Sequence, residues 1–242
     1  MVAKQVFYSF NFPLVRTRFV ERPNRFLIRC ALEGNDKDRV EAHLTDPGRL
    51  KELLVPGRSV WLRSVPNSKR KTQWSAVLCE TPDGNALVSI DATFPNRLIV
   101  RALEMKALEE FSSYASIKAE YTVAGSRWDF LLEDPDKEPL LIEVKSVTLV
   151  ENGIGLFPDA VTARGAKHVR TLSKLIRERR YDGAILFVVQ REDAKAVKAA
   201  EHIDPAFASA LEEARQAGVR ILGRLCNVSL EGISLGEVIE AG

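Results

Sequence analysis

The sequence is poor in the residues that build disulfide frameworks, zinc sites and membrane spans. Its 242 residues include 3 cysteines and 3 histidines, all scattered and without a Cys-x-x-Cys pair. This usage is typical of buried, reduced thiols in a cytosolic protein and argues against structural zinc. The sequence also contains no apolar run long enough to cross a bilayer, and no signal-peptide core follows Met1. We therefore expect a cytoplasmic protein that does not contact membranes.

Several nucleotide-binding and catalytic motifs are missing as well, including a Gly-rich phosphate loop, a serine-nucleophile elbow and a helix-turn-helix. The net charge of +2 conceals an asymmetry between the two parts of the chain. Residues 1–90 hold 15 Lys+Arg against 9 Asp+Glu, whereas residues 91–242 hold 20 against 24. A basic module for phosphate attraction followed by an acidic one for metal binding fits this pattern, and ordinary scatter fits it equally well.

The first 90 residues have the pattern of short strands separated by turns. Strands are predicted over Arg25–Leu32, Ser59–Val65, Trp74–Cys79 and Ala86–Ile90, with a short helix over Thr45–Leu54. A set of about five short strands with one helix predicts a small barrel of the oligonucleotide-binding (OB) type.

From about residue 91 the pattern changes to helices alternating with strands. Helices are predicted over residues 96–113, 162–180 and 205–218, and strands over 117–123, 126–133, 140–149, 183–189 and 219–228. Helices around a mixed central sheet indicate an α/β layer domain. The prediction is thus an α/β protein with a barrel domain at 1–90 and a layered domain at 91–242.

Two of these predicted strands, 126–133 and 140–149, carry acids inside apolar runs. The polar, proline-containing segment between them predicts a hairpin. Because side chains alternate along a strand, Glu143 and Lys145 share one face, and the hairpin can bring Asp129 alongside Glu143. Metal-dependent nucleases use this Asp…Glu-x-Lys arrangement: carboxylates hold Mg²⁺ or Mn²⁺, and the ammonium orients the attacking water and offsets charge developing on the phosphate. The predicted catalytic residues are Asp129, Glu143 and Lys145, with the two acids as metal ligands.

The Glu-x-Lys tripeptide alone is weak evidence, because it recurs at Glu104-Met105-Lys106. On a strand with one wet face, Glu143 and Lys145 would be only a surface ion pair. Context separates the two copies. The 143–145 copy lies in a near-continuous apolar run, as central strands do, whereas the 104–106 copy lies in a predicted helix where its charges point in different directions.

Cations that could contact nucleic acid lie in both parts of the chain. The candidates are Arg16, Arg18, Arg22, Arg25, Arg49, Lys69, Arg70 and Lys71 in the first part, and Arg127, Arg164, Lys167 and His168 in the second. Lys174 and Arg177 continue the basic stripe of the 162–180 helix but are interpreted as solvated. Trp61 and Trp74 could stack on bases, although core positions are the more common interpretation.

Taken together, these motifs resemble the sugar fermentation stimulation protein A family almost end to end. The matching segments are Arg22–Phe26, His43–Leu50, Arg70–Thr72, Asn96–Leu98, Ser126–Phe130, Glu143–Leu149, Phe157–Thr162, Arg164-Gly165, Lys167-His168 and Ile203-Asp204. The resemblance implies an OB barrel, a restriction-endonuclease-like domain of the PD-(D/E)xK type, and DNA binding with little sequence preference. It carries the nuclease residues over onto Asp129, Glu143 and Lys145. Where the family pattern has an acid in the first helix this chain has Arg101, so Glu104 or Glu120 is the candidate for a further metal ligand.

Three functions follow as alternatives. The first is a Mg²⁺- or Mn²⁺-dependent nuclease that hydrolyses DNA. The second is a non-catalytic DNA-binding regulatory protein of sugar (maltose) metabolism that keeps a nuclease fold. The third is an enzyme that uses the same carboxylates on a small phosphate ester. The choice of DNA or RNA, its strandedness and the formation of a homodimer stay open.

Overall fold

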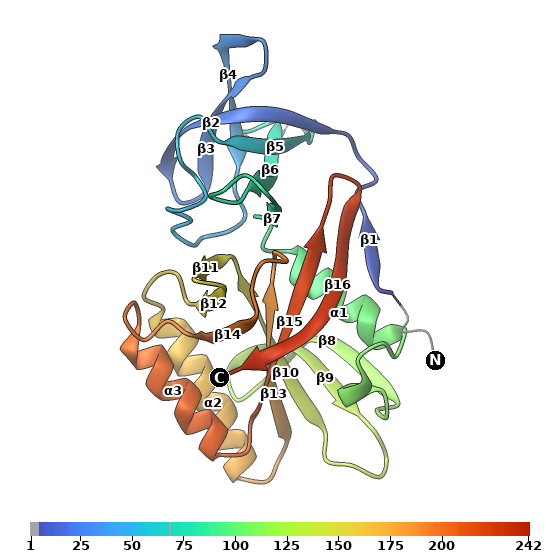
Figure 1. The fold of residues 1–242 in the computed structure, drawn as a ribbon. Helices are drawn as coiled ribbons and strands as arrows, with labels where there is room; N and C mark the ends of the chain where they lie inside the picture. The colour runs from blue at the N-terminus through green and yellow to red at the C-terminus, as the bar shows by residue number, and fades with distance from the viewer. Residues whose placement is uncertain (1–4, 68) are drawn as a thin grey trace.

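The N-terminal half forms a closed barrel in the computed structural model, which describes residues 5–67 and 69–242. The barrel strands are β2 (Leu14–Asn24), β3 (Leu27–Leu32), β4 (Asn35–His43), β5 (Ser59–Ser64) and β6 (Trp74–Glu80). Each pairs with two neighbours, and the parallel β4–β6 pair closes the ring. A short strand, β7 (Leu87–Ser89), extends β6. The predicted five-stranded OB-type barrel is confirmed (Figure 1).

The barrel differs from the prediction in three local features. The helix predicted over Thr45–Leu54 is wrong: the segment forms turns, because Leu50 adopts a left-handed φ of 50°. Its leucines, including Leu53, are instead buried in the barrel core. β2 and β4 escaped prediction because charged residues interrupt their apolar alternation.

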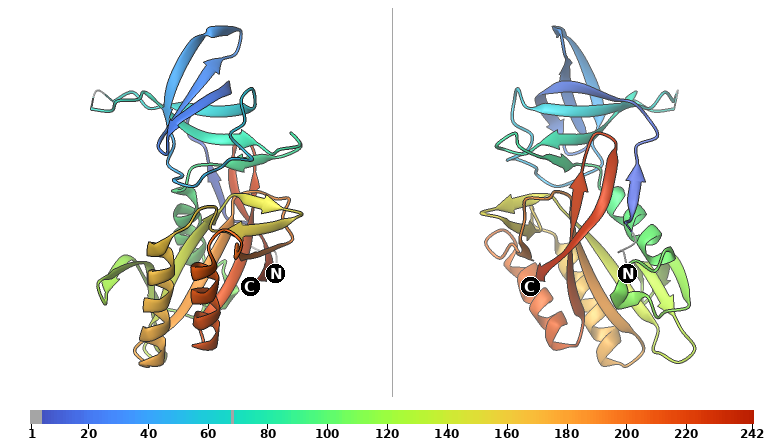
Figure 2. Two further views of the ribbon diagram at one scale, coloured as in Figure 1. Left: turned by 90° about the vertical axis from the view of Figure 1, so that its left-hand side faces the viewer. Right: turned by 45° about the vertical axis from the view of Figure 1, so that its right-hand side comes forward.

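The C-terminal half is built on a mixed sheet of ten strands. Nine strands follow the order β11-β12-β14-β16-β15-β13-β10-β9-β8, and β1 pairs with β16. Their bounds are β1 Phe7–Ser9, β8 Ser116–Val123, β9 Ser126–Glu133, β10 Leu140–Val147, β11 Leu149–Glu151, β12 Ile154–Phe157, β13 Asp182–Val189, β14 Ala196–Ala199, β15 Arg220–Val228 and β16 Gly232–Ala241. Because β1 joins this sheet, the start of the predicted first domain belongs structurally to the second (Figure 2).

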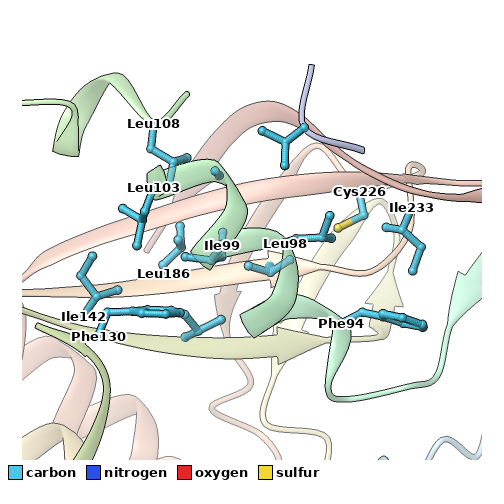
Figure 3. Close-up of a cluster of buried hydrophobic side chains, with 14 of the residues drawn as sticks. Phe94, Leu98, Ile99, Leu103, Leu108, Phe130, Ile142, Leu186, Cys226 and Ile233 are labelled. Carbon is cyan, nitrogen blue, oxygen red and sulfur yellow. The ribbon is translucent and has the colours of Figure 1, made fainter. Parts of the chain in front are cut away.

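Helices cover both faces of the sheet, as the layered prediction requires. α1 (Phe94–Glu104) packs on one face with Leu98 and Ile142 in a shared apolar cluster (Figure 3). α2 (Ala163–Arg177) and α3 (Pro205–Gln216) pack on the other. Among the described residues, no helix is long and apolar enough to span a bilayer.

Two predicted elements end earlier than expected. The helix predicted over 96–113 stops at Glu104, because Lys106 takes a left-handed φ of 51°, and a 3₁₀ turn, η1 (Glu109–Phe111), follows. The strand predicted over 140–149 breaks at Thr148, which separates β10 from β11. Both endings are backbone features that the spacing of apolar residues does not encode.

Candidate functional site

The predicted acids meet where the β9–β10 hairpin stops pairing. The paired residues end at Ile142 and Phe130. Beyond them the backbone N–H of Val144 donates to Asp129 Oδ2 at 2.7 Å. The alternation of β9 also changes here: Trp128 packs in the cluster under α2, and Phe130 packs in the cluster under α1. The Asp129 carboxylate thus takes the place of a backbone partner for Val144 N–H, and this bond holds Asp129 next to β10, as the sequence predicted.

Glu143 is the centre of the polar contacts. Its Oε1 accepts from Lys145 Nζ at 2.5 Å and from His168 Nδ1 at 2.9 Å. Its other oxygen, Oε2, is buried and has no hydrogen-bond partner within the described residues. Since buried carboxylate oxygens are normally satisfied, Oε2 is an acceptor held ready for a further donor or a cation.

The two acids differ in their pKa shifts. Burial and the charge of Glu143 raise the pKa of Asp129, although Val144 N–H and the Asn96 amide oppose this. Burial alone would raise the pKa of Glu143, but the charge of Lys145 and the hydrogen bond with His168 outweigh it and lower that pKa. Two carboxylates that repel each other in a buried place are stabilised by any positive charge between them.

His168 is placed by packing that the sequence patterns did not reveal. It lies on α2, whose first turn is capped by Thr162 Oγ1 accepting from Gly165 N at 3.0 Å. Its ring stacks on Trp128 with centroids 4.1 Å apart and an interplanar angle of 12°. This stack directs Nδ1 at Glu143, so a residue predicted to contact nucleic acid also positions the Glu143 carboxylate.

Asn96 is a further site residue that sequence analysis missed. Its Nδ2 donates to Asp129 Oδ1 at 2.7 Å from the first turn of α1. Glu104 lies at the other end of this helix and is exposed, about 12 Å further along the axis at 1.5 Å per residue. The family motif Asn96–Leu98 was the signal that could have pointed to this residue.

Cavities surround these side chains. One of about 260 Å³ is lined by Asp129, Glu143, Lys145 and His168, with Arg127, Phe157, Thr162, Arg164 and Gly165. A neighbouring one of about 190 Å³ has Arg127, Arg164, Lys167 and His168 among its lining residues. We call the first the acidic cavity and the second the basic cavity. The candidates predicted in the C-terminal half therefore lie together.

The donor set of the acidic cavity fits a Mg²⁺-like cation. Such ions are held by one or two carboxylates and keep several waters. Asp129 and Glu143, the latter with its unpartnered Oε2, are the two carboxylates of this set. Within residues 5–67 and 69–242, no group of three or more His, Cys, Asp or Glu is arranged to hold a metal ion. Glu104 and Glu120 therefore do not join the pair, and Glu120 instead lies 3.7 Å from Arg127.

The cations predicted in the barrel divide into two groups. Arg16, Arg18 and Arg22 are engaged within the protein. Arg16 pairs with Glu80 at 3.2 Å, Arg18 donates to the Gly57 carbonyl, and Arg22 donates to the carbonyls of Arg49, Arg25 and Asp46. Arg25, Arg49, Lys69 and Lys71 are exposed, and Arg70 is half-buried. In this second group Arg70 donates to Ser75 Oγ at 2.9 Å, and the other four side chains are exposed where a polyanion could reach them.

The two tryptophans occupy core positions, and Lys174 and Arg177 are exposed on α2, the more common interpretations of these residues. Trp61 is buried, and Trp74 packs against the barrel core. On α2, Lys174 lies 3.7 Å from Glu178, and Arg177 donates to the carbonyl of Glu213 on α3. These side chains stabilise the fold and are not arranged around the acidic cavity.

Comparisons with known proteins agree with this architecture. The profile described as "SfsA N-terminal OB domain" matches residues 20–90, and that described as "Sugar fermentation stimulation protein RE domain" matches residues 93–232. A solved structure of Pyrococcus furiosus SfsA in complex with Ca²⁺ aligns with a TM-score of 0.87 at 27% identity, covering 99% of this chain and 100% of that one.

Curated relatives share most of the sequence. A sugar fermentation stimulation protein homolog of Shouchella clausii is 46% identical over 223 residues, covering 92% of this chain and 95% of that protein. The homolog of Moorella thermoacetica is 43% identical over 225 residues, with coverages of 92% and 94%. The barrel, the mixed sheet and these similarities establish that the chain belongs to the sugar fermentation stimulation protein family.

Proposed function

We propose that this protein binds DNA and hydrolyses its phosphodiester bonds in a reaction that depends on Mg²⁺ or Mn²⁺. The observation that carries the proposal is the buried Asp129–Glu143 pair with an unpartnered Glu143 oxygen and Lys145 beside it. The OB-type barrel supports a nucleic-acid substrate. Contacts to phosphates carry no sequence information, so little sequence preference is expected.

Each side chain has a distinct role in this proposal. Asp129 and Glu143 would hold the cation, which when bound would polarise a phosphate oxygen. Lys145 Nζ, already in the cavity, offsets negative charge that develops on the phosphate. His168 fixes the orientation of Glu143, and Asn96 fixes that of Asp129. Arg127, Arg164 and Lys167 would bind neighbouring phosphates from the basic cavity.

A divalent cation has a precedent on this fold. The Pyrococcus furiosus protein is described as a complex with Ca²⁺. Ca²⁺ and Mg²⁺ are both hard cations that prefer oxygen ligands, so a carboxylate pair suits either. This supports cation binding in the present chain without fixing which ion supports turnover.

The test is cleavage of end-labelled DNA, single-stranded and double-stranded, in EDTA, Mg²⁺ and Mn²⁺. We expect cleavage only with a divalent cation and its loss in Asp129→Asn. Glu133→Gln is the matched control, because Glu133 is on the same strand and forms an exposed pair with Lys118. Cleavage that persists in Asp129→Asn would show that the assigned site is wrong.

A second readout separates cation binding from cleavage. Mg²⁺ or Mn²⁺ should raise the thermal unfolding midpoint of the wild type. Since a ligand at ten times its Kd stabilises by about 1.4 kcal/mol, the shift is measurable by calorimetry. Asp129→Asn should show a much smaller shift, whereas Glu133→Gln should behave as the wild type does.

The second candidate function is DNA binding without cleavage, in a regulatory role. Lys145 and His168 already hold Glu143 Oε1, so the pair can serve as a structural anchor. The names of the relatives link the family to sugar fermentation. This function predicts salt-dependent binding, with a log–log slope set by the number of phosphate contacts, and no turnover in any metal.

A further inference from the structure

An exposed aromatic ring lies on the barrel, away from the acidic cavity. Phe26, at the β2–β3 turn, is 49% exposed. It lies beside the His43 ring, with centroids 6.5 Å apart and planes inclined by 27°. The Arg25 guanidinium lies 5.9 Å from the Phe26 ring centroid. A single exposed apolar side chain is common on protein surfaces, and what distinguishes Phe26 is the set of groups around its ring.

The backbone beneath this ring is well fixed. Phe26 N donates to Asn24 Oδ1 at 2.9 Å, and its carbonyl accepts from Leu44 N at 3.0 Å. His43 Nδ1 lies 3.2 Å from the same carbonyl. The aromatic surface is therefore held in place before any ligand arrives, which lowers the entropy cost of binding.

The ring opens onto a cationic groove of about 520 Å³, which we call the barrel groove. Its lining includes Phe26, His43, Arg63, Arg70 and Lys71. Glu41 is the acid among its lining residues, and it already pairs with Arg29 at 2.9 Å. Within the described residues, no ion pair joins Arg63, Arg70 or Lys71 to a carboxylate. Arg70 donates to Ser75 Oγ at 2.9 Å and the Arg63 guanidinium lies 4.9 Å from the Phe12 ring centroid, contacts that leave their charges without an acidic partner. An aromatic surface beside cations that no carboxylate neutralises suits a nucleotide, which offers a π-face and a phosphate.

The barrel groove and the acidic cavity are related through a third cavity. Residues next to its lining, Arg25 and the segment 46–48, line an interdomain cavity of about 310 Å³. That cavity shares Lys145, Phe157 and Thr162 with the acidic cavity. The barrel sits at one end of the second sheet (Figures 1 and 2).

The two acids that line the interdomain cavity accept hydrogen bonds from the protein backbone. Asp46 Oδ1 accepts from Gly48 N at 2.8 Å, and Asp159 Oδ2 accepts from Leu50 N at 3.2 Å. The first bond is local to the 46–50 segment, and the second joins this segment of the barrel to the loop before α2. We call the barrel groove, the interdomain cavity and the acidic cavity together the track: the last two share lining residues, and the first two have lining residues that are neighbours in the chain.

We infer that the barrel groove binds an unpaired nucleotide, with its base stacked on Phe26 and its strand continuing along the track to the acidic cavity. The inference rests on the proposed DNA binding and adds strandedness to it. In a duplex both faces of a base are covered by neighbouring bases, so an aromatic side chain can receive only a base that has left the stack.

The test is binding of a fluorescent oligo-dT strand and of a duplex of equal length, measured by anisotropy in EDTA so that cleavage plays no part. Phe26→Ala should weaken single-strand binding by about five-fold to 100-fold, the range of one lost stacking contact, with little effect on the duplex. The salt slope should stay unchanged because no charge is removed. Phe26→Trp should restore affinity.

The control is Phe7→Ala, which removes another exposed phenylalanine, 38% exposed and away from the described cavities. A direct readout is the fluorescence of Phe26→Trp, which the oligonucleotide should quench more than that of the wild type. If both DNAs bind and Phe26→Ala binds the single strand normally, or loses duplex affinity equally, this inference fails and the proposed function stands. If neither DNA binds at low salt, both fail.

Discussion

Two Glu-x-Lys tripeptides in this chain have very different surroundings. Glu143 and Lys145 lie on β10 with side chains only 10% and 12% exposed, next to Asp129. Glu104 and Lys106 lie at the exposed end of α1, where Lys106 has a left-handed backbone. Within the described residues no ion pair joins the second two. The same residue types become a chemical site only where a second acid and burial surround them, because low dielectric strengthens every charge interaction.

The largest expected difference between the two tripeptides is in DNA cleavage. Glu143→Gln should reduce the cleavage rate by about a hundred-fold to a thousand-fold, since it removes a charge proposed to hold the cation and the partner of Lys145. Glu104→Gln should leave the rate unchanged. Single-turnover kinetics with saturating Mn²⁺ measures both. Equal effects of the two variants would remove the distinction between the copies.

Stability should differ next. Lys145→Ala leaves the buried Glu143 charge with one cationic partner fewer, which should cost about 3 kcal/mol of unfolding free energy. Lys106→Ala removes an exposed side chain and should change it by less than about 0.5 kcal/mol. Urea unfolding in EDTA compares them. A loss at Lys145 no larger than at Lys106 would mean that Glu143 is not held as a buried anion.

A third buried acid, Asp46, shows how burial raises a carboxyl pKa, in contrast to the lowered pKa of Glu143 beside Lys145. Asp46 is 7% exposed, and burial raises its pKa to about 6. Since the unfolded value is near 3.8, its stabilising contribution is complete below that pH and is lost as pH rises through about 6. The change is about 3 kcal/mol, from 1.36 kcal/mol per pH unit.

Asp46→Asn should flatten this part of the stability curve, as measured by urea unfolding between about pH 4 and 7. Asp83→Asn is a control in which the pKa shift has the opposite direction. Hydrogen bonds from Thr81 and Asn85 lower the Asp83 pKa to about 2, so its contribution is lost as pH falls. A wild-type curve without a slope between the two Asp46 values would show that Asp46 is not destabilised by burial.

The smallest expected effect is at Lys106. Left-handed backbone costs a residue with a Cβ about 1 kcal/mol, and glycine avoids this cost. Lys106→Gly should therefore raise the free energy of unfolding by up to about 1 kcal/mol without altering cleavage. Calorimetry alongside the cleavage assay tests both parts. A loss of cleavage would indicate that the end of α1 contributes to the site after all.

Much of the fold was predictable from local patterns. Short alternating segments predicted the barrel, and helices among apolar strands predicted the mixed α/β sheet. The errors lie where backbone geometry overrides periodicity. Leu50 and Lys106 take left-handed conformations that end or prevent helices, and β4 carries too many charges for its alternation to be visible.

Local sequence patterns were enough to predict the side chains of the candidate site: Asp129 on one strand, Glu143 and Lys145 on the next, and a basic first turn on the 162–180 helix. These features follow from side-chain alternation and helical spacing, which act over a few residues. The positions of these side chains relative to one another depend on tertiary structure. Only packing decided that His168 stacks on Trp128 to reach Glu143, that Asn96 holds Asp129, and that β1 joins the second sheet. Such contacts join residues far apart in the chain, and local periodicity carries no information about which distant faces will meet.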